Sequence, residues 1–182
     1  ENRPKDVLEF ENVNTRVTEL ICDAIRLSNR KIPLILASST QADLDNPYGK
    51  SKLAAEKVVE ALEAETGNPS YIYRLPSVFG KWCKPNYNSV VATFCHNIAQ
   101  GLPIQIDNKF TELKLVYIDD VVFEFLNIIY GNKKMDLYSE VKPEYKISIG
   151  ELADQIRSFH NSRKSLITDK VGDGLIGRLY ST

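Results

Sequence analysis

The chain has 182 residues, which is long enough for one domain with a sizeable hydrophobic core. Its formal net charge is −1 and 26% of its residues are charged, so nothing in its composition indicates a basic surface for nucleic acid or for an acidic membrane. The sequence contains no apolar run of the ~20 residues that cross a bilayer, and its first residues do not have the pattern of a signal peptide. We therefore expect no nucleic-acid partner and no membrane partner.

The chain begins with a predicted helix and a predicted strand. Apolar residues follow a helical period over about residues 11–29. Residues 33–38, PLILAS, form a short apolar run after a proline. Such a run is typical of a strand that is buried on both faces of a parallel sheet.

A second helix and strand follow. Asp45 or Asn46 can cap the helix, Pro47 suits its first position, and Gly67 marks its end. Residues 70–75 predict the next strand. The alternation of helices and strands indicates a βαβ unit in a doubly wound parallel sheet.

The sequence pattern of the second half of the chain predicts three more helices and two short strands. In chain order they are helix 88–101, strand 102–106, strand 112–118, helix 119–131 and helix 148–159. Ser148 and Glu151 have the spacing of a capping box at the start of the last helix. The tail, residues 164–182, has little pattern.

Tyr48 and Lys52 stand four residues apart near the start of a predicted helix, so they share one helix face. Ser38, Ser39 and Thr40 follow the apolar run, at the carboxyl edge of the sheet where ligands bind. A carbonyl that accepts a hydride needs a proton donor, and a lysine beside a tyrosine can lower the pKa of the phenol. The set therefore predicts proton transfer coupled to hydride transfer. The alternative is a packing tyrosine beside a surface lysine.

Five segments, in this order, resemble the extended short-chain dehydrogenase/reductase family. They are LEFENVNTRVTELICDAIR, LILASST, NPYGKSKLAAEKVV, YRLPSVFG and LVYIDDVV. The resemblance implies an α/β fold: a Rossmann-like, doubly wound parallel sheet with a small α+β substrate-binding portion. Within the family, the chain most resembles the reductase domain of bifunctional capsular polysaccharide synthesis enzymes, which also carry a cupin epimerase domain.

The resemblance implies an NAD(P)H-dependent oxidoreductase. Its expected reaction is the NADPH-dependent reduction of the C4 ketone of a UDP-4-keto-6-deoxy-N-acetylhexosamine in capsular polysaccharide precursor synthesis. Gln41 and Ala42 follow Thr40, where nucleotide-sugar 4,6-dehydratases carry an Asp-Glu pair, so dehydration is disfavoured. Two alternatives stay open: a nucleotide-sugar C4 epimerase with tightly bound NAD, and a non-catalytic NADP-sensing protein. The resemblance also implies a homodimer and a cytoplasmic location.

The resemblance gives three residues catalytic roles. Thr40 matches the hydroxyl that binds the substrate carbonyl, with Ser39 as a second candidate. Tyr48 matches the general acid. Lys52 matches the residue that binds the nicotinamide ribose and lowers the pKa of the tyrosine.

The resemblance also implies binding residues. Those at the cofactor, besides Tyr48 and Lys52, are Ser38, Ser39, Arg74, Pro76, Ser77 and Val78. Those at the substrate, besides Thr40, are Asn86, Asn88 and Ser89, although Asn86 and Asn88 can equally be simple helix caps. For Asp119 and Asp120 we favour capping of the next helix over catalysis.

The whole chain, residues 1–182, is expected to be a partial domain of the family. Its nucleotide-binding core would comprise about 1–80 and 109–131, and its substrate-binding portion about 81–108 and 132–182. The family's Gly-rich βαβ unit and the cupin domain have no counterpart in the sequence, so we expect weak cofactor binding by these residues alone. The three cysteines and two histidines have no ligand spacing, so we expect reduced thiols and no metal.

Overall fold

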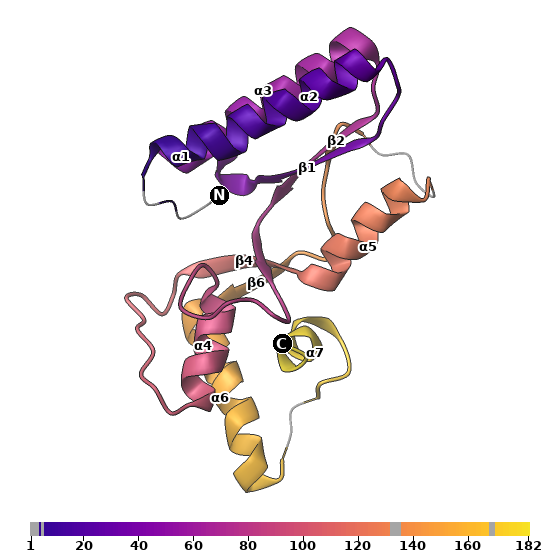
Figure 1. Cartoon of the computed structure of the whole chain (residues 1–182). Coiled ribbons are helices and arrows are strands. Elements are labelled where there is room, and N and C mark those ends of the chain that lie inside the picture. The colour runs from indigo at the N-terminus through magenta and orange to yellow at the C-terminus, as the bar shows by residue number, and fades with distance from the viewer. Residues whose placement is uncertain (1–3, 5, 132–135, 168–169) are drawn as a thin grey trace. The chain divides into compact units, whose positions relative to one another are not determined.

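The computed structural model describes Pro4 and residues 6–131, 136–167 and 170–182, which form an α/β fold (Figure 1). The helices are α1 (Leu8–Phe10), α2 (Val17–Ser28), α3 (Pro47–Thr66), α4 (Val90–Ala99), α5 (Ile118–Ile129), α6 (Ile149–Ser165) and α7 (Gly174–Tyr180). The strands are β1 (Leu34–Ser39), β2 (Ser70–Leu75), β3 (Ser77–Phe79), β4 (Glu112–Tyr117), β5 (Tyr138–Ser139) and β6 (Tyr145–Ser148). A π-helix, η1 (Glu11–Arg16), and a 3₁₀-helix, η2 (Thr40–Asp43), complete the described elements. None of these helices is long and apolar enough to span a membrane.

The chain divides into two compact units. The first unit comprises residues 1–76 and 123–141, and the second comprises residues 77–122 and 142–182. The first unit is therefore built from two separate stretches of sequence. The assignment of cofactor and substrate roles to parts of the chain stays a prediction.

The first unit contains a parallel sheet in the order β1-β2-β5. Helices α2 and α3 lie side by side and pack on one face of it (Figure 1), where Ile72 of β2 joins Cys22 and Leu62 in a buried core. Successive side chains of a strand point to opposite faces, and the next residue, Tyr73, packs against Phe125 of α5 with ring centroids 5.1 Å apart. Helices therefore cover both faces of the strand, as the doubly wound prediction requires.

The predicted burial of the first strand is wrong in one respect. Residues Leu34–Leu36 are half-buried rather than buried, and Ala37 is exposed. Strand β1 pairs only with β2 among the described residues, so it forms the edge of this sheet. A strand at an edge has fewer neighbours to cover its side chains than a central one, which explains the difference.

The ends of α3 confirm the signals in the sequence. Asn46 is the cap: its side-chain oxygen accepts a hydrogen bond of 2.8 Å from the N–H of Gly49. Pro47 occupies the first helical turn, where a missing N–H costs nothing. Gly67 ends the helix in the left-handed conformation that glycine adopts without a steric penalty.

The second unit has its own sheet, in the order β3-β4-β6, with β3 parallel and β6 antiparallel to β4. Its buried core includes Phe79, Leu115 and Leu152, from β3, β4 and α6. The predicted capping box at the start of α6 is confirmed: Ser148 accepts from the Glu151 N–H and the Glu151 carboxylate accepts from the Ser148 N–H.

One predicted strand is wrong. Residues 102–106 form no strand, although Ile104 and Ile106 pack against the core of the second unit. Pro103 has no N–H for a sheet ladder, and its carbonyl accepts instead from the side chain of Asn97 at 3.1 Å. The apolar residues of this segment are therefore covered without strand pairing. The tail that showed little pattern forms the short helix α7.

Candidate active site

The carboxyl end of β1 turns directly into η2, and this turn separates the two candidate hydroxyls. The Ser39 side chain accepts a hydrogen bond of 3.2 Å from the Gln41 N–H and is only 8% exposed. Thr40 begins the turn and is exposed. The sequence favours Thr40, but it is Ser39 that lies beside the next candidate residue, Tyr48.

Tyr48 is half-buried in the first turn of α3. Its ring lies 5.7 Å from that of Phe10 in the approach to α2. Burial raises the pKa of the Tyr48 phenol, and a hydrogen bond with the Ser39 side chain opposes that rise. The phenol is therefore protonated at neutral pH, as a proton donor must be.

Lys52 lies one turn further along α3. Its Nζ atom donates a hydrogen bond of 3.0 Å to the carbonyl of Ala37 and lies 5.8 Å from the centre of the Tyr48 ring. Burial lowers the pKa of Lys52, and the Glu56 carboxylate opposes this effect. Burial is the largest cause at Tyr48 and raises its pKa in this structure. The predicted lowering of that pKa by Lys52 stays a prediction.

Gly49 allows η2 to approach the start of α3. A Cβ atom at this position would lie 2.2 Å from the carbonyl oxygen of Gln41 and 2.6 Å from that of Leu44, both backbone atoms. No side chain larger than hydrogen fits there. The glycine after Tyr48 therefore brings the Ser39 turn and the Tyr48 helix together.

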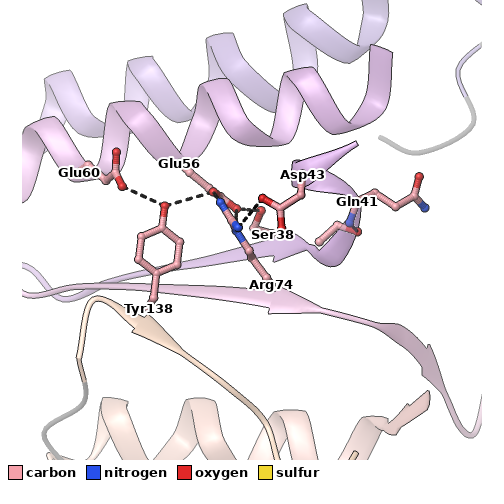
Figure 2. A network of polar contacts seen from close by, with 8 residues as sticks. Ser38, Gln41, Asp43, Glu56, Glu60, Arg74 and Tyr138 are labelled. Atoms are coloured by element: carbon pink, nitrogen blue, oxygen red, sulfur yellow. Dashed lines mark hydrogen bonds and ion pairs between the residues drawn. The ribbon is translucent and has the colours of Figure 1, made fainter. Parts of the chain in front are cut away.

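A buried carboxylate follows Lys52 on the same helix face. Glu56 is fully buried, and Ser38 donates a hydrogen bond to it (Figure 2). Arg74, at the end of β2, donates three hydrogen bonds of 2.6–3.1 Å to the same carboxylate. Glu56 therefore ties the ends of two neighbouring strands to α3.

Arg74 is predicted to contact the cofactor, but its contacts are with protein carboxylates. Besides Glu56 it pairs with Asp43 of η2 at 2.8 Å (Figure 2), and the hydrogen bonds to Glu56 raise its pKa further. These partners occupy the guanidinium and favour a structural role. Pro76, another predicted cofactor residue, is half-buried just after β2.

Sequence reasoning missed Tyr138 of β5. Its ring lies 5.1 Å from the Arg74 guanidinium, and its hydroxyl lies 2.9 Å from a Glu60 oxygen and 3.2 Å from a Glu56 oxygen (Figure 2). Desolvation and the hydrogen bond to Glu60 raise the pKa of Tyr138, so the hydroxyl remains a donor. The spacing of Glu56 four residues after Lys52 was a visible signal, whereas nothing near Tyr138 in the sequence indicated its contact.

The other predicted binding residues belong to the second unit. Ser77 is exposed and Val78 half-buried, both in β3. Ser89 is the cap of α4 and accepts from the Ala92 N–H at 3.3 Å. Asn86 and Asn88 are exposed before it, and the N–H of Asn86 donates to Thr93 at 3.0 Å. The capping role weighed for the two asparagines is thus filled by Ser89.

A hollow of about 280 Å³ in the second unit was not predicted. It is lined by Tyr145, Val171, Gly172, Asp173, Gly174, Gly177, Arg178 and Ser181. Arg178 is paired at 2.7 Å with Asp120, and Asp119 is paired at 3.1 Å with Lys81. Within the described ranges, no group of three or more His, Cys, Asp or Glu residues is arranged to hold a metal.

Residues 2–136 match the family model of the NAD dependent epimerase/dehydratase family. The chain belongs to this family. The Ser39, Tyr48 and Lys52 set lies within the matched residues, and so do β1, α3 and β2.

Two named proteins are similar to the chain over nearly all of its length. A protein of Pseudomonas aeruginosa, UDP-2-acetamido-2,6-β-L-arabino-hexul-4-ose reductase, is 52% identical over 100% of this chain and 49% of its own length. The crystal structure of the capsular polysaccharide assembling protein CapF from Staphylococcus aureus matches with a TM-score of 0.85 and 40% identity, over 91% of this chain and 46% of that one. The chain thus spans about half the length of these two relatives.

More distant members share the fold alone. The UDP-glucose 4-epimerase of Thermotoga maritima matches with a TM-score of 0.79 over 98% of this chain and 70% of that one, at 17% identity. Identity at this level identifies the Rossmann-like fold and carries no information about which reaction is catalysed.

Proposed function

We propose that the protein reduces the C4 ketone of a UDP-4-keto-6-deoxy-N-acetylhexosamine with NADPH, in the synthesis of a capsular polysaccharide precursor. The observation that carries the proposal is the position of Tyr48 and Lys52 on one face of α3, with the Lys52 Nζ atom 5.8 Å from the Tyr48 ring and bonded to the Ala37 carbonyl, next to Ser39 at the carboxyl end of a parallel strand. The names of the Pseudomonas and Staphylococcus relatives support the substrate class and the link to capsule synthesis.

In the proposed reaction, Ser39 donates a hydrogen bond that holds the substrate carbonyl oxygen. Tyr48 gives its proton to that oxygen, and Lys52 stabilises the resulting phenolate. A bound NADPH would supply the hydride to C4, and this hydride together with the Tyr48 proton would convert the ketone to an alcohol. The hydroxyl and ammonium donors of the set fit the ribose and nicotinamide end of such a cofactor.

The preference for Ser39 over Thr40 comes from the structure rather than from the resemblance. Ser39 is buried and its side chain lowers the pKa of the Tyr48 phenol against the effect of burial, whereas Thr40 is exposed. For Ser38 and Arg74 we propose supporting contacts within the site. We keep Pro76, Ser77 and Val78 as proposed cofactor neighbours.

On the substrate side we propose contacts from Asn86, Asn88 and Ser89, in the second unit. We also propose a cytoplasmic location, in keeping with the free thiols of the three cysteines Cys22, Cys83 and Cys95.

The proposed reaction is tested by following NADPH oxidation by the full-length protein, meaning the chain with any sequence that flanks it in its gene. With a UDP-4-keto-6-deoxy-N-acetylhexosamine we expect one NADP⁺ released for each alcohol formed, and slower oxidation of NADH. An epimerase, the alternative reading, would convert its sugar without net loss of NADPH. A sensing protein would bind the cofactor with no turnover, and the intact Ser39, Tyr48 and Lys52 set argues against it.

We propose that the protein forms a homodimer through α2 and the π-helix before it. Val13, Val17, Leu20 and Ile21 recur at helical spacing, yet each is between 45% and 53% exposed. Beside them is a hollow lined by Arg16, Glu19, Asp23, Arg26, Lys57, Val58 and Ala61. A surface with apolar residues and charges of both signs can face a second copy of itself across a two-fold axis.

A charge placed in the apolar stripe is expected to break this dimer. Light scattering should give the mass of two chains for the wild type and of one chain for Leu20→Glu, because the glutamate would be desolvated in the interface. Leu166→Glu serves as the control: Leu166 is also an exposed leucine, 88% exposed at the end of α6, and its variant should stay dimeric. A monomeric wild type would contradict the proposed dimer.

A further inference from the structure

Glu56 is the most enclosed charged side chain near the candidate site, with none of its surface exposed. A buried carboxylate is costly unless it is paired and hydrogen-bonded, and this one accepts hydrogen bonds from three different strands. The donors are Ser38 of β1, Arg74 of β2 and Tyr138 of β5 (Figure 2). Because three strands donate hydrogen bonds to the Glu56 carboxylate, the position of this side chain is strongly constrained.

The hydrogen bond from Ser38 connects Glu56 to the hydroxyl set. Ser38 precedes Ser39 at the end of β1, so holding Ser38 against α3 also fixes where Ser39 begins its turn. Glu56 follows Lys52 by four residues, so the two share one face of the helix that also carries Tyr48. One carboxylate therefore joins the strand that supplies Ser39 to the helix that supplies the other two residues.

The charged groups around Glu56 come from β2, η2 and α3, whereas β1 and β5 contribute neutral hydroxyls. Arg74 pairs with it from β2, Asp43 of η2 shares Arg74, and Glu60 lies one turn further along α3 (Figure 2). Lys52 is the neighbouring cation in the site, and the Glu56 carboxylate raises its pKa against the effect of burial. Removing that carboxylate would leave the Lys52 ammonium less stable.

We propose that Glu56 is a positioning residue of the active site: it holds β1 and α3 in the arrangement that brings Ser39, Tyr48 and Lys52 together, and places a negative charge one helical turn from the Lys52 ammonium. Glu56 itself touches neither substrate nor cofactor in this role. The kinetic part of the proposal rests on the proposed reductase function, whereas the part on Lys52 does not.

The test compares Glu56→Gln with Glu60→Gln in the full-length protein. Both changes replace a carboxylate of α3 that accepts from Tyr138 with a neutral amide, but only the first alters the group that bonds to Ser38 and Arg74. Two quantities are measured: kcat and KM for the ketosugar, and the pKa of Lys52 from the NMR signal of its isotope-labelled dimethylated amine, assigned with Lys52→Arg.

For Glu56→Gln we expect the pKa of Lys52 to fall and kcat to drop about tenfold or more with little change in KM, because small misplacements of reacting groups are costly. Glu60→Gln should keep the wild-type pKa of Lys52 and the wild-type kcat. A folded Glu56→Gln with both quantities unchanged would overturn the proposal, and so would equal losses in the two variants.

If Glu56→Gln does not fold, Ser38→Ala tests the positioning role in its place, since it deletes only the hydroxyl that bonds to Glu56. A folded Ser38→Ala with lowered kcat supports the positioning role, and one with wild-type kcat overturns it. Failure of the wild type to oxidise NADPH with any ketosugar would instead defeat the proposed function. In that case the pKa of Lys52 in Glu56→Gln and Glu60→Gln still tests the link between Glu56 and Lys52.

Discussion

Tyr48→Phe is expected to lower kcat for ketosugar reduction by about 10²–10⁴-fold, the range that a positioned general acid contributes. Phenylalanine keeps the ring that packs against Phe10, so the fold should be preserved, while the proton-donating hydroxyl is lost. Since the raised pKa of Tyr48 keeps the phenol protonated at neutral pH, the loss should be fully visible there. The measurement is steady-state NADPH oxidation, with circular dichroism as a check on folding.

Tyr130→Phe is the matched control, because Tyr130 is 70% exposed at the end of α5 and its hydroxyl has no place in the site. Its rate should equal that of the wild type. In the same assay Ser39→Ala should lose more activity than Thr40→Ala. If Tyr48→Phe turned over at the wild-type rate, the proton would have to come from another donor and the proposed mechanism would be wrong.

Gly49→Ala is expected to destabilise the protein by about 3 kcal/mol, a value at the upper end for overpacking of a buried position. The added methyl group would lie 2.2 Å and 2.6 Å from two backbone oxygens, which cannot move as the end of a flexible side chain can. The added methyl group is accommodated only if η2 moves away from α3, so activity should fall together with stability. Urea denaturation measures the change in the free energy of unfolding.

Gly172→Ala provides the comparison for that result. A Cβ atom at Gly172 meets nothing within 4 Å, so the same chemical change should alter the free energy of unfolding by less than about 0.5 kcal/mol. Equal stability losses in the two variants would show that the close approach at Gly49 is not the cause.

The sequence predicted well those parts of the fold that local signals determine. The cap at Asn46, the proline after it and the glycine at 67 defined α3, and the strand over 70–75 was found with its bounds intact. Tyr48 and Lys52 could be found because their spacing places them on one helix face whatever the rest of the fold does.

The features of the site and fold that depend on residues far apart in the sequence could not be predicted. Ser39 and Thr40 are adjacent hydroxyls, and only the start of η2 after β1 decides which of them faces Tyr48. The contact of Tyr138 with Glu56 joins residues 82 positions apart. For residues 102–106 the apolar pattern was real, but those side chains pack on the core without a partner strand.

The contact of Tyr138 with α3 also bears on how the protein is made. The first unit comprises residues 1–76 and 123–141, so residues 77–122 of the second unit emerge from the ribosome before the first unit can close. Until β5 is synthesised, the carboxylate of Glu56 lacks the hydroxyl of Tyr138, and β2 lacks one neighbour. Contacts of such sequence separation slow folding. The scaffold of the candidate site is thus completed only after residues 77–122 of the second unit have been synthesised, and a ribosome stalled before residue 138 would hold a nascent chain in which β2 lacks its β5 neighbour.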